Sequence, residues 1–460
     1  MDISVREILT ATQGQWTGTA AAAASRVGGV STDTRTVEKG DVFFALKGQR
    51  FDGHDYLKEA VQKGAKCLVV SEIPGLAEFK EPLGFIRVAD TLTAYGDLAK
   101  FYRQNFKIPA IAITGSAGKT TVKELVAHVL QHHFKVLKNR GTENNLVGVP
   151  KTLLQLEKEH EVMVLEMGTN QPGEIDRLSS MIAPQLGILT QIGLAHLEGL
   201  KTQEGIKQEK LSVLNHIDRG GFLILNGQDP LLRDVQSGVH RIRRVGLSKE
   251  GSDRTAEQVW CHEEGCSFYV EGALFETSLI GRHNVVNCLY AIEAALILGM
   301  PLDSIQKAIQ LFKAVPGRMS LKNIDGIFFL DDSYNSNPNS FRAALETLKD
   351  FKMRGRKGIV CGDMLELGAQ AEALHREIGA WMAELLFDFV IATGPFSKHL
   401  VEGALKQGFD PKRICHAKDS LEAGKICREL ALPGDRILVK GSRGMQMEKV
   451  FECFITSSIR

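Results

Sequence analysis

The stretch "AIAITGSAGKTT", residues 110–121, decides how this chain folds. Its first residues are apolar and predict a buried strand, its glycines predict a tight turn, and "KTTVKELVAHVL" from Lys119 predicts a helix. A strand, a glycine turn and a helix in this order are typical of a phosphate-binding loop, because glycine lets backbone N–H groups approach an anion at the positive end of a helix. The loop is short: only Ser116 and Ala117 separate Gly115 from Gly118, and the usual loop has more residues between these glycines.

The polar residues after the turn favour nucleotide binding over an ordinary strand-to-helix turn with a capping threonine. The Lys119 side chain is long enough to reach terminal phosphates, and the Thr120 hydroxyl is suited to Mg²⁺. The candidate phosphate-binding residues are Gly115, Ser116, Ala117, Gly118, Lys119, Thr120 and Thr121.

Polar residues also follow neighbouring predicted strands. Glu166 ends the strand "VMVLEMG", and His196 follows the strand "LGILTQIG". Since the carboxyl ends of parallel strands share one edge of a sheet, we expect both residues near the phosphate loop, where they are candidate Mg²⁺ ligands. On the next helix, Lys207 and Lys210 are by themselves typical of a solvated charged face.

The order of predicted elements indicates an α/β protein with three domains. Residues 1–106 form a small α/β domain, residues 107–315 a central parallel-sheet domain and residues 316–460 a doubly wound, Rossmann-like domain without the G-x-G-x-x-G fingerprint. Within the central domain, "GCSFYVEGALFETSLIG" predicts an antiparallel appendage. The run "TAAAAAS" (19–25) is expected to be a loop or a short strand.

Composition excludes several classes. The 460 residues are 43% hydrophobic and 24% charged with a net charge of +1, which argues against a nucleic-acid binder or a membrane-surface binder. Eight scattered cysteines indicate reduced thiols and not a disulfide framework, and Cys261 and Cys266, which flank His262, lack the second ligand pair of a zinc site. With no signal-peptide pattern and no apolar run long enough to span a membrane, the chain is expected to be cytoplasmic. A monomer is a separate expectation.

Two further segments carry binding candidates. "GRHNVVNCLYAIEAA" begins a helix on which Asn284 and Asn287 share a face, which suits either a purine contact or routine capping. "DDSYNSNPNS" (331–340) follows an apolar strand and carries acidic, aromatic and amide groups at its carboxyl end.

Together these motifs resemble the ATP-dependent Mur ligases of bacterial peptidoglycan synthesis, from the N-terminal domain to the last helix. The short loop "TGSAGKTT" is similar to the variant that this family shares with folylpolyglutamate synthetases. The segments "TENNLVGVPKTLL", "GRHNVVNCLYA", "DDSYNSNPNS" and "GDMLELG" resemble the member of the family that adds a dipeptide.

The resemblance implies a ligation. ATP phosphorylates the C-terminal carboxylate of a UDP-muramoyl tripeptide, the amine of D-alanyl-D-alanine attacks the acyl phosphate, and ADP and phosphate leave. Thr120, Glu166, His196 and Lys210 would hold Mg²⁺, with Lys210 as a carbamylated lysine. The family usually reads Ala-Lys-x-Glu around this lysine, whereas this chain reads Glu-Lys-Leu-Ser, and Lys207 is the alternative.

The resemblance also implies the remaining binding residues. The adenosine and phosphate contacts would be Asn284, Asn287, Arg318 and Asp332. The UDP contacts would be Thr34, Arg35, Phe51, Asp52, Gly53 and His54, the nucleotide-sugar peptide contacts Asn144 and Asn145, and the dipeptide contacts Tyr334, Asn335 and Asn337.

Two alternatives remain at this point. Ligases that add a single amino acid usually have Asp-Tyr-(Ala/Gly)-His or Asp-Gly-Ala-His-Asn-Pro where this chain has Tyr334-Asn-Ser-Asn-Pro338, which argues against them. A regulatory P-loop NTPase has no evident need for a UDP-binding-like domain at one end and a Rossmann-like domain at the other.

Overall fold

The computed structural model describes the whole chain except residues 1–2, 49–50, 74–78, 80–83, 353–354 and 456–460. Its residues form two compact units. The first contains residues 1–112, 134–168 and 174–185, and the second contains residues 113–133, 169–173 and 186–460. The boundaries of the three predicted domains stay a prediction. Within the described ranges, every helix is too short or too polar to cross a membrane.

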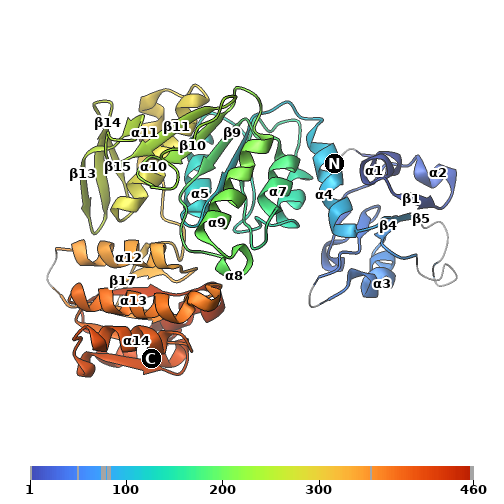
Figure 1. Ribbon diagram of the computed structural model, residues 1–460. Coiled ribbons are helices and arrows are strands. Elements are labelled where there is room, and N and C mark those ends of the chain that lie inside the picture. The colour runs from blue at the N-terminus through green and yellow to red at the C-terminus, as the bar shows by residue number, and fades with distance from the viewer. Residues whose placement is uncertain (1–2, 49–50, 74–78, 80–83, 353–354, 456–460) are drawn as a thin grey trace. The chain divides into compact units, whose positions relative to one another are not determined.

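The first unit begins with a five-stranded sheet of order β1-β5-β4-β3-β2, whose pairs are parallel except β1 with β5. The apolar runs of the inner strands β3 and β4 are wholly buried, as continuous apolar strands predict. The strands are β1 (Gln15–Thr17), β2 (Val30–Ser31), β3 (Val42–Phe44), β4 (Cys67–Val70) and β5 (Gly84–Arg87). The helices of this part, drawn in blue in Figure 1, are α1 (Val5–Thr12), α2 (Ala20–Ala23), α3 (Leu57–Gln62) and α4 (Thr91–Arg103).

The alanine run was expected to be a loop or a short strand, and this prediction is wrong. Ala20–Ala23 form the short helix α2, because alanine has the highest helix propensity and Thr19 caps the helix by accepting the Ala22 N–H at 3.2 Å.

The rest of the first unit carries the parallel pair β7 and β8. Its elements are β7 (Val136–Lys138), α6 (Gly148–Leu153), β8 (Val162–Glu166) and α7 (Glu174–Ile182). Strand β8 is buried along its whole length and ends on Glu166, as the sequence predicts.

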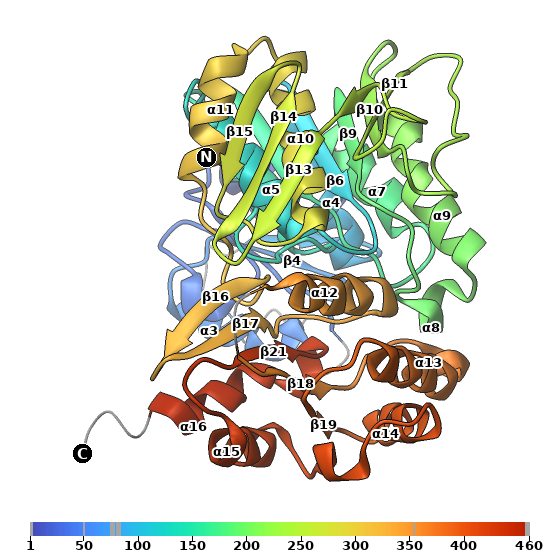
Figure 2. The same ribbon diagram turned by 90° about the vertical axis from the view of Figure 1, so that its left-hand side faces the viewer.

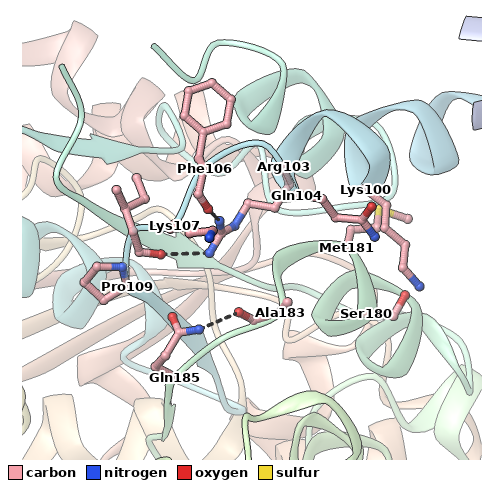
Figure 3. A pocket seen from close by; sticks show the side chains of 11 residues that line it. Lys100, Arg103, Gln104, Phe106, Lys107, Pro109, Ser180, Met181, Ala183 and Gln185 are labelled. Carbon is pink, nitrogen blue, oxygen red and sulfur yellow. Dashed lines mark hydrogen bonds between the residues drawn. The ribbon is translucent and has the colours of Figure 1, made fainter. Parts of the chain in front are cut away.

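The buried side chain of Arg103 fixes the segment that leads from α4 into strand β6 (Ala110–Thr114). Its guanidinium donates to the carbonyls of Phe106, Ile108 and Ile182, the last two at 2.9 and 3.1 Å. Figure 3 shows this side chain in the lining of a groove of about 540 Å³. Ser180 and Met181, from the end of α7, line the same groove. The approach of the chain to the strand that carries the phosphate loop is therefore held by a buried cation on backbone carbonyls.

The second unit contains a parallel run of strands in the order β12-β11-β10-β9 and the separate antiparallel sheet β13-β14-β15. The parallel strands and the antiparallel appendage confirm the prediction. The strands are β9 (Leu186–Leu189), β10 (Phe222–Asn226), β11 (Arg241–Gly246), β12 (Arg254–Thr255), β13 (Glu257–His262), β14 (Gly265–Val270) and β15 (Ala273–Thr277). The helices are α5 (Lys119–Leu130), α8 (Leu197–Leu200), α9 (Gln203–Leu211), α10 (Arg282–Ile297) and α11 (Leu302–Leu311).

The same unit ends in a six-stranded sheet of order β16-β17-β21-β18-β19-β20, parallel except for the edge strand β16. Helices α13 and α14 cover one face and α15 and α16 the other (Figure 2), which confirms the doubly wound prediction. The strands are β16 (Ser320–Ile324), β17 (Ile327–Asp332), β18 (Lys357–Gly362), β19 (Phe389–Thr393), β20 (Ile414–Ala417) and β21 (Arg436–Lys440). The helices are α12 (Pro338–Asp350), α13 (Ala371–Glu384), α14 (Ser397–Lys406), α15 (Ser420–Leu430) and α16 (Glu452–Ile455).

The expectation that all cysteines are reduced is wrong for one pair. Cys261 and Cys266 lie directly opposite each other on β13 and β14, with their Cα atoms 4.2 Å apart, and they form a disulfide. The register of a hairpin brings cross-strand neighbours together, and a linear count of scattered cysteines does not contain this information. The other six cysteines are free.

Candidate active site

The phosphate loop begins where β6 ends, at Thr114. Gly115 has a φ of +147° and Gly118, the residue before α5, has a φ of +81°, and both values favour glycine. The Ser116 hydroxyl donates to the Gly193 carbonyl at 3.0 Å and accepts the Gly193 N–H at 2.9 Å. The loop is thus held against the segment after β9 by hydrogen bonds within the protein.

Gly115 leaves no room for a side chain. A Cβ there would lie 1.9 Å from the Thr190 Oγ1 atom, whose hydroxyl donates to the Ala117 carbonyl at 2.5 Å. We predict that Gly115→Ala lowers the free energy of unfolding by about 2–4 kcal/mol through backbone strain and collision together. Gly220→Ala, at a φ of +79° with open space around it, should cost only about 1 kcal/mol. Urea denaturation of both variants measures the difference, and equal losses would contradict the close contact with Thr190.

The first residues of α5 carry the polar groups of the loop. The Lys119 ammonium donates to the Gly115 carbonyl at 2.8 Å, so it closes the loop on itself. Thr120 and Thr121 are both buried, and the Thr120 hydroxyl accepts a hydrogen bond from the Arg318 guanidinium at 3.3 Å. The structure therefore brings Arg318, from the segment before β16, to the phosphate loop.

Helix α10 carries two buried asparagines, of which Asn287 lies beside the same loop. The Asn287 side chain donates to the Asn284 Oδ1 atom at 2.8 Å, and Asn284 donates to the Ile280 carbonyl at 2.8 Å. A Cβ on Gly118 would lie 3.1 Å from the Asn287 Oδ1 atom. Asn284 does not cap the helix, because Gly281 stands at the N-cap position. The pair is therefore a buried amide network beside the loop.

The segment after β17 also reaches the loop. Asn337 caps α12 by accepting the Ser340 N–H at 2.9 Å, and its amide donates to the Ser116 carbonyl at 3.1 Å. The Tyr334 ring lies under the Arg318 guanidinium, with 4.1 Å from the Arg318 Cζ atom to the ring centre. One residue, Asn337, thus starts a helix of the C-terminal sheet and contacts the phosphate loop.

Asp332 at the end of β17 is paired with a buried lysine that the sequence prediction did not contain. The Lys440 ammonium donates to Asp332 at 2.5 Å and to the carbonyl of Asn335 at 3.1 Å. Burial lowers the pKa of Lys440, and Asp332 opposes this shift. The Asn335 side chain accepts the Ser336 N–H at 2.9 Å, so it shapes its own turn.

The structure distinguishes the two candidate lysines of α9. Lys210 is 1% exposed, whereas Lys207 is only partly buried. Burial lowers the pKa of Lys210 well below its usual range, and the positive charge of Lys119 acts in the same direction, against the opposing effect of Glu209. Among the described residues, no carboxylate lies within ion-pair distance of the Lys210 ammonium. The structure therefore favours Lys210 as the unusual lysine.

His196, which precedes α8, lies against a residue of the C-terminal domain. Its Nδ1 atom is 2.6 Å from the Oε2 atom of Glu366. Burial lowers the pKa of His196, and the contact with Glu366 opposes this effect. The contact with His196 lowers the pKa of Glu366.

Glu166 in the first unit is buried and only half satisfied. Its Oε1 atom accepts the Asn144 amide at 2.7 Å, and its Oε2 atom is buried without a hydrogen-bond partner. A buried carboxylate oxygen without a donor is suited to a cation, so the residue fits the predicted Mg²⁺ role. The described ranges contain no preformed group of three or more His, Cys, Asp or Glu side chains at metal-binding distance.

The backbone of Glu166 is fixed by Asn139, a wholly buried residue that the sequence prediction missed. The Asn139 side chain accepts the Glu166 N–H at 3.0 Å and donates to its carbonyl at 3.0 Å. Asn145 accepts the N–H groups of Val147 and Gly148 at 3.1 and 2.9 Å, so it holds the turn that precedes α6.

The N-terminal candidates form two local groups. Asp33 accepts the Arg35 guanidinium at 2.6 Å, with Arg35 exposed and the neighbouring Thr34 buried. The second group joins Asp52 to the His54 Nδ1 atom at 2.6 Å, and the His54 Nε2 atom lies 3.0 Å from the Ser71 backbone nitrogen.

Between the residues of the second group, Gly53 packs so closely that a Cβ would lie 2.8 Å from the backbone of Ala45. Phe51 is 59% exposed, which leaves an aromatic face available beside Asp52.

The residues that the sequence prediction missed share one property. Asn139, Thr190, Glu366 and Lys440 act through contacts with residues far away in the sequence. The sequence could have pointed to Glu366, because it lies in the segment "GDMLELG" on which the family resemblance rests. No local sequence pattern marks the other three residues.

The strand β6, the glycine loop and the Lys-Thr start of helix α5 place the chain in the class of P-loop nucleotide-binding proteins. Three family models match the chain: the Mur ligase family catalytic domain over residues 26–103, the Mur ligase middle domain over 113–295 and the Mur ligase glutamate ligase domain over 317–443. The chain belongs to the Mur ligase family and has its three-domain α/β fold.

Curated relatives and solved structures match over nearly the whole chain. The UDP-N-acetylmuramoyl-tripeptide–D-alanyl-D-alanine ligases of Bacillus subtilis (strain 168) and Escherichia coli (strain K12) are 36% and 34% identical, over 94% and 92% of both chains. A crystal structure of MurF from Acinetobacter baumannii has a TM-score of 0.90 at 31% identity, with 99% of both chains covered. MurF from Thermotoga maritima in complex with ADP has a TM-score of 0.82 at 28% identity, covering 93% of this chain and 97% of that one.

Proposed function

We propose that this chain is an ATP-dependent ligase that adds D-alanyl-D-alanine to UDP-N-acetylmuramoyl-tripeptide in peptidoglycan precursor synthesis, and so serves cell-wall formation, cell shape and division. The observation that carries the proposal is the contact between the Asn337 amide and the Ser116 carbonyl. It joins the "YNSNP" segment, which distinguishes a dipeptide-adding member, to the loop that binds phosphate. The curated names of the full-length relatives support the same activity.

The proposed chemistry begins with transfer of the ATP γ-phosphoryl group to the tripeptide carboxylate. Lys119 leaves the Gly115 carbonyl and neutralises charge on the transferring group, while loop N–H groups and the start of α5 hold the phosphates. The D-alanyl-D-alanine amine then attacks the acyl carbon, the C–N bond forms, the C–O bond to phosphate breaks and the amine loses a proton.

We assign Thr120, Glu166, His196 and Lys210 to Mg²⁺, which neutralises phosphate charge when bound. The Glu166 assignment rests on its motif and its unpartnered Oε2 atom. Lys210 is suited to carbamylation, because a lysine with a lowered pKa is neutral more often and its free amine can add CO₂ with loss of a proton. The product carries the negative charge that a metal ligand needs.

The remaining assignments follow the motifs. Asn284, Asn287, Arg318 and Asp332 would contact ATP. Thr34, Arg35, Phe51, Asp52, Gly53 and His54 would bind the UDP moiety, Asn144 and Asn145 the nucleotide-sugar peptide, and Tyr334, Asn335 and Asn337 the dipeptide. In this proposal the protein is a cytoplasmic monomer with domains at 1–106, 107–315 and 316–460, and it binds neither nucleic acid nor membrane.

Substrate dependence of ADP release tests the function. We expect release only when UDP-muramoyl tripeptide and D-alanyl-D-alanine are both present, because a productive acyl phosphate needs the first and turnover needs the second. A coupled ADP assay with each substrate left out in turn measures this. ATP hydrolysis indifferent to both substrates would instead indicate a regulatory NTPase.

A further inference from the structure

The segment around Glu366, which follows β18, touches the segment around His196 at more than one point. The side chains meet at 2.6 Å between Nδ1 of His196 and Oε2 of Glu366, and the Glu198 N–H donates to the Glu366 carbonyl at 3.3 Å. A Cβ on Gly368 would lie 3.6 Å from the Glu198 Cα atom, so the two backbones also pack closely.

Both partners hold an uncommon backbone conformation. His196 has a φ of +57° and Glu366 a φ of +64°, in the left-handed region where a residue other than glycine costs about 1–2 kcal/mol. Such conformations persist where the surrounding structure holds them, and they cluster at functional sites. The strain lies in the two residues whose side chains meet.

The contact with Glu366 involves one of the two imidazole nitrogens of His196, Nδ1. Nδ1 faces the carboxylate at a hydrogen-bond distance, although the angle of the contact is not that of a hydrogen bond. Contacts of this kind are often misaligned before a ligand binds and tighten in the complex. A histidine that ligates a metal almost always presents its other ring nitrogen to a carboxylate, a carbonyl or water, which fixes the tautomer and the orientation of the ring.

We propose that Glu366 is a positioning residue of the nucleotide site: its carboxylate holds Nδ1 of His196 so that Nε2 is presented to the metal–nucleotide ligand. The inference rests on the proposed function, since it gives His196 a ligand. It also assigns a task to the C-terminal domain, because the His196 ring is oriented only when that domain brings Glu366 into place.

A second histidine–glutamate pair in the same domain provides a matched control. On α14, the His399 Nδ1 atom lies 2.9 Å from the Glu402 Oε2 atom, and Glu402 is half exposed like Glu366. This pair lies within a single helix, and neither residue is among those with a positive φ. Glu402→Gln therefore removes the same type of contact away from the phosphate loop.

The experiment is a double-mutant cycle on binding of Mg²⁺·ADP, measured by calorimetry with the full chain. The variants are Glu366→Gln, His196→Ala, the double variant and Glu402→Gln, and glutamine is chosen because it changes the charge and keeps the side-chain length. We expect Glu366→Gln to weaken binding by about 10- to 100-fold in the wild-type background and by less than about twofold in the His196→Ala background. Glu402→Gln should bind as the wild type does, and melting temperatures show that each variant is folded.

Turnover provides the second measurement. We expect Glu366→Gln to lower kcat, with KM for D-alanyl-D-alanine within about twofold of the wild type, because the contact acts on the nucleotide side of the reaction. Equal weakening by Glu366→Gln in both backgrounds, or no weakening in the wild type, would overturn the positioning role, as would a loss confined to KM. A wild-type protein that neither binds Mg²⁺·ADP nor ligates would instead overturn the proposed function.

Discussion

Replacement of Lys119 by alanine is expected to lower kcat/KM for ligation by at least about 100- to 1,000-fold, while the protein remains folded. In the proposed mechanism the Lys119 ammonium neutralises charge on the transferring phosphoryl group. A single electrostatic donor at a reacting centre commonly contributes a rate factor of about this size. The ammonium donates to the Gly115 carbonyl at 2.8 Å, and loss of this hydrogen bond should lower the free energy of unfolding by about 1 kcal/mol. Steady-state ADP release and urea denaturation measure the two effects.

The matched control is Lys249→Ala. Lys249 is exposed and pairs with Glu257, so its removal deletes an equal charge outside the site and should leave turnover unchanged. Near-normal ligation by Lys119→Ala would show that the phosphate loop is wrongly assigned.

Replacement of Lys210 should lower ligation activity to a comparable extent, but added carboxylates should restore part of it. Lys210→Ala removes the proposed carbamate, so we expect ligation to fall by at least about 100-fold and to recover in part when formate or acetate is added. A small carboxylate fits the space left by the lysine chain and restores the negative charge. Initial rates at increasing carboxylate concentration measure the recovery.

Two comparisons separate the carbamate from a purely structural lysine. Lys210→Met fills the buried space, so it should stay inactive and resist rescue while unfolding no more readily than the alanine variant. Lys207→Ala should keep most of its activity, because Lys207 is partly exposed. Failure of carboxylates to rescue an inactive Lys210→Ala would argue against the carbamate and for a purely structural lysine. Loss of activity with Lys207→Ala alone would argue for Lys207.

The elements that the sequence predicts best are those whose signal is local. Continuous apolar runs mark strands such as β6, β8 and β21, and glycines with a following Lys-Thr mark the loop that begins α5. The alanine run at α2 was mispredicted because a polar cap, Thr19, decides the state of a segment with little side-chain information. Pairing across strands, as between Cys261 and Cys266, depends on register and cannot be counted along the chain.

The site residues, too, are predicted from the sequence where their signal is local and not where it depends on the fold. Lys119 and Thr120 follow from the loop motif. Asn284 and Asn287 follow from their helix spacing, although only the structure shows Asn287 beside Gly118. Lys210 could not be distinguished from Lys207 by periodicity, because burial separates the two.

Residues that position other residues were the hardest to predict from the sequence. Asn139, which holds the backbone of Glu166, and Glu366, which meets His196, act on partners that lie far away in the sequence. Such residues are visible only when the fold brings their partners to them.

Identification of the product by mass tests the central claim most directly. The protein is incubated with ATP, Mg²⁺, UDP-N-acetylmuramoyl-tripeptide and D-alanyl-D-alanine. We predict one ATP-dependent product whose mass is the sum of the two substrates less one water, formed in equal amount with ADP. Single amino acids can also be offered together with D-alanyl-D-alanine. A product that carries one added amino acid, or ADP without any amide product, would contradict the assignment as a dipeptide-adding ligase.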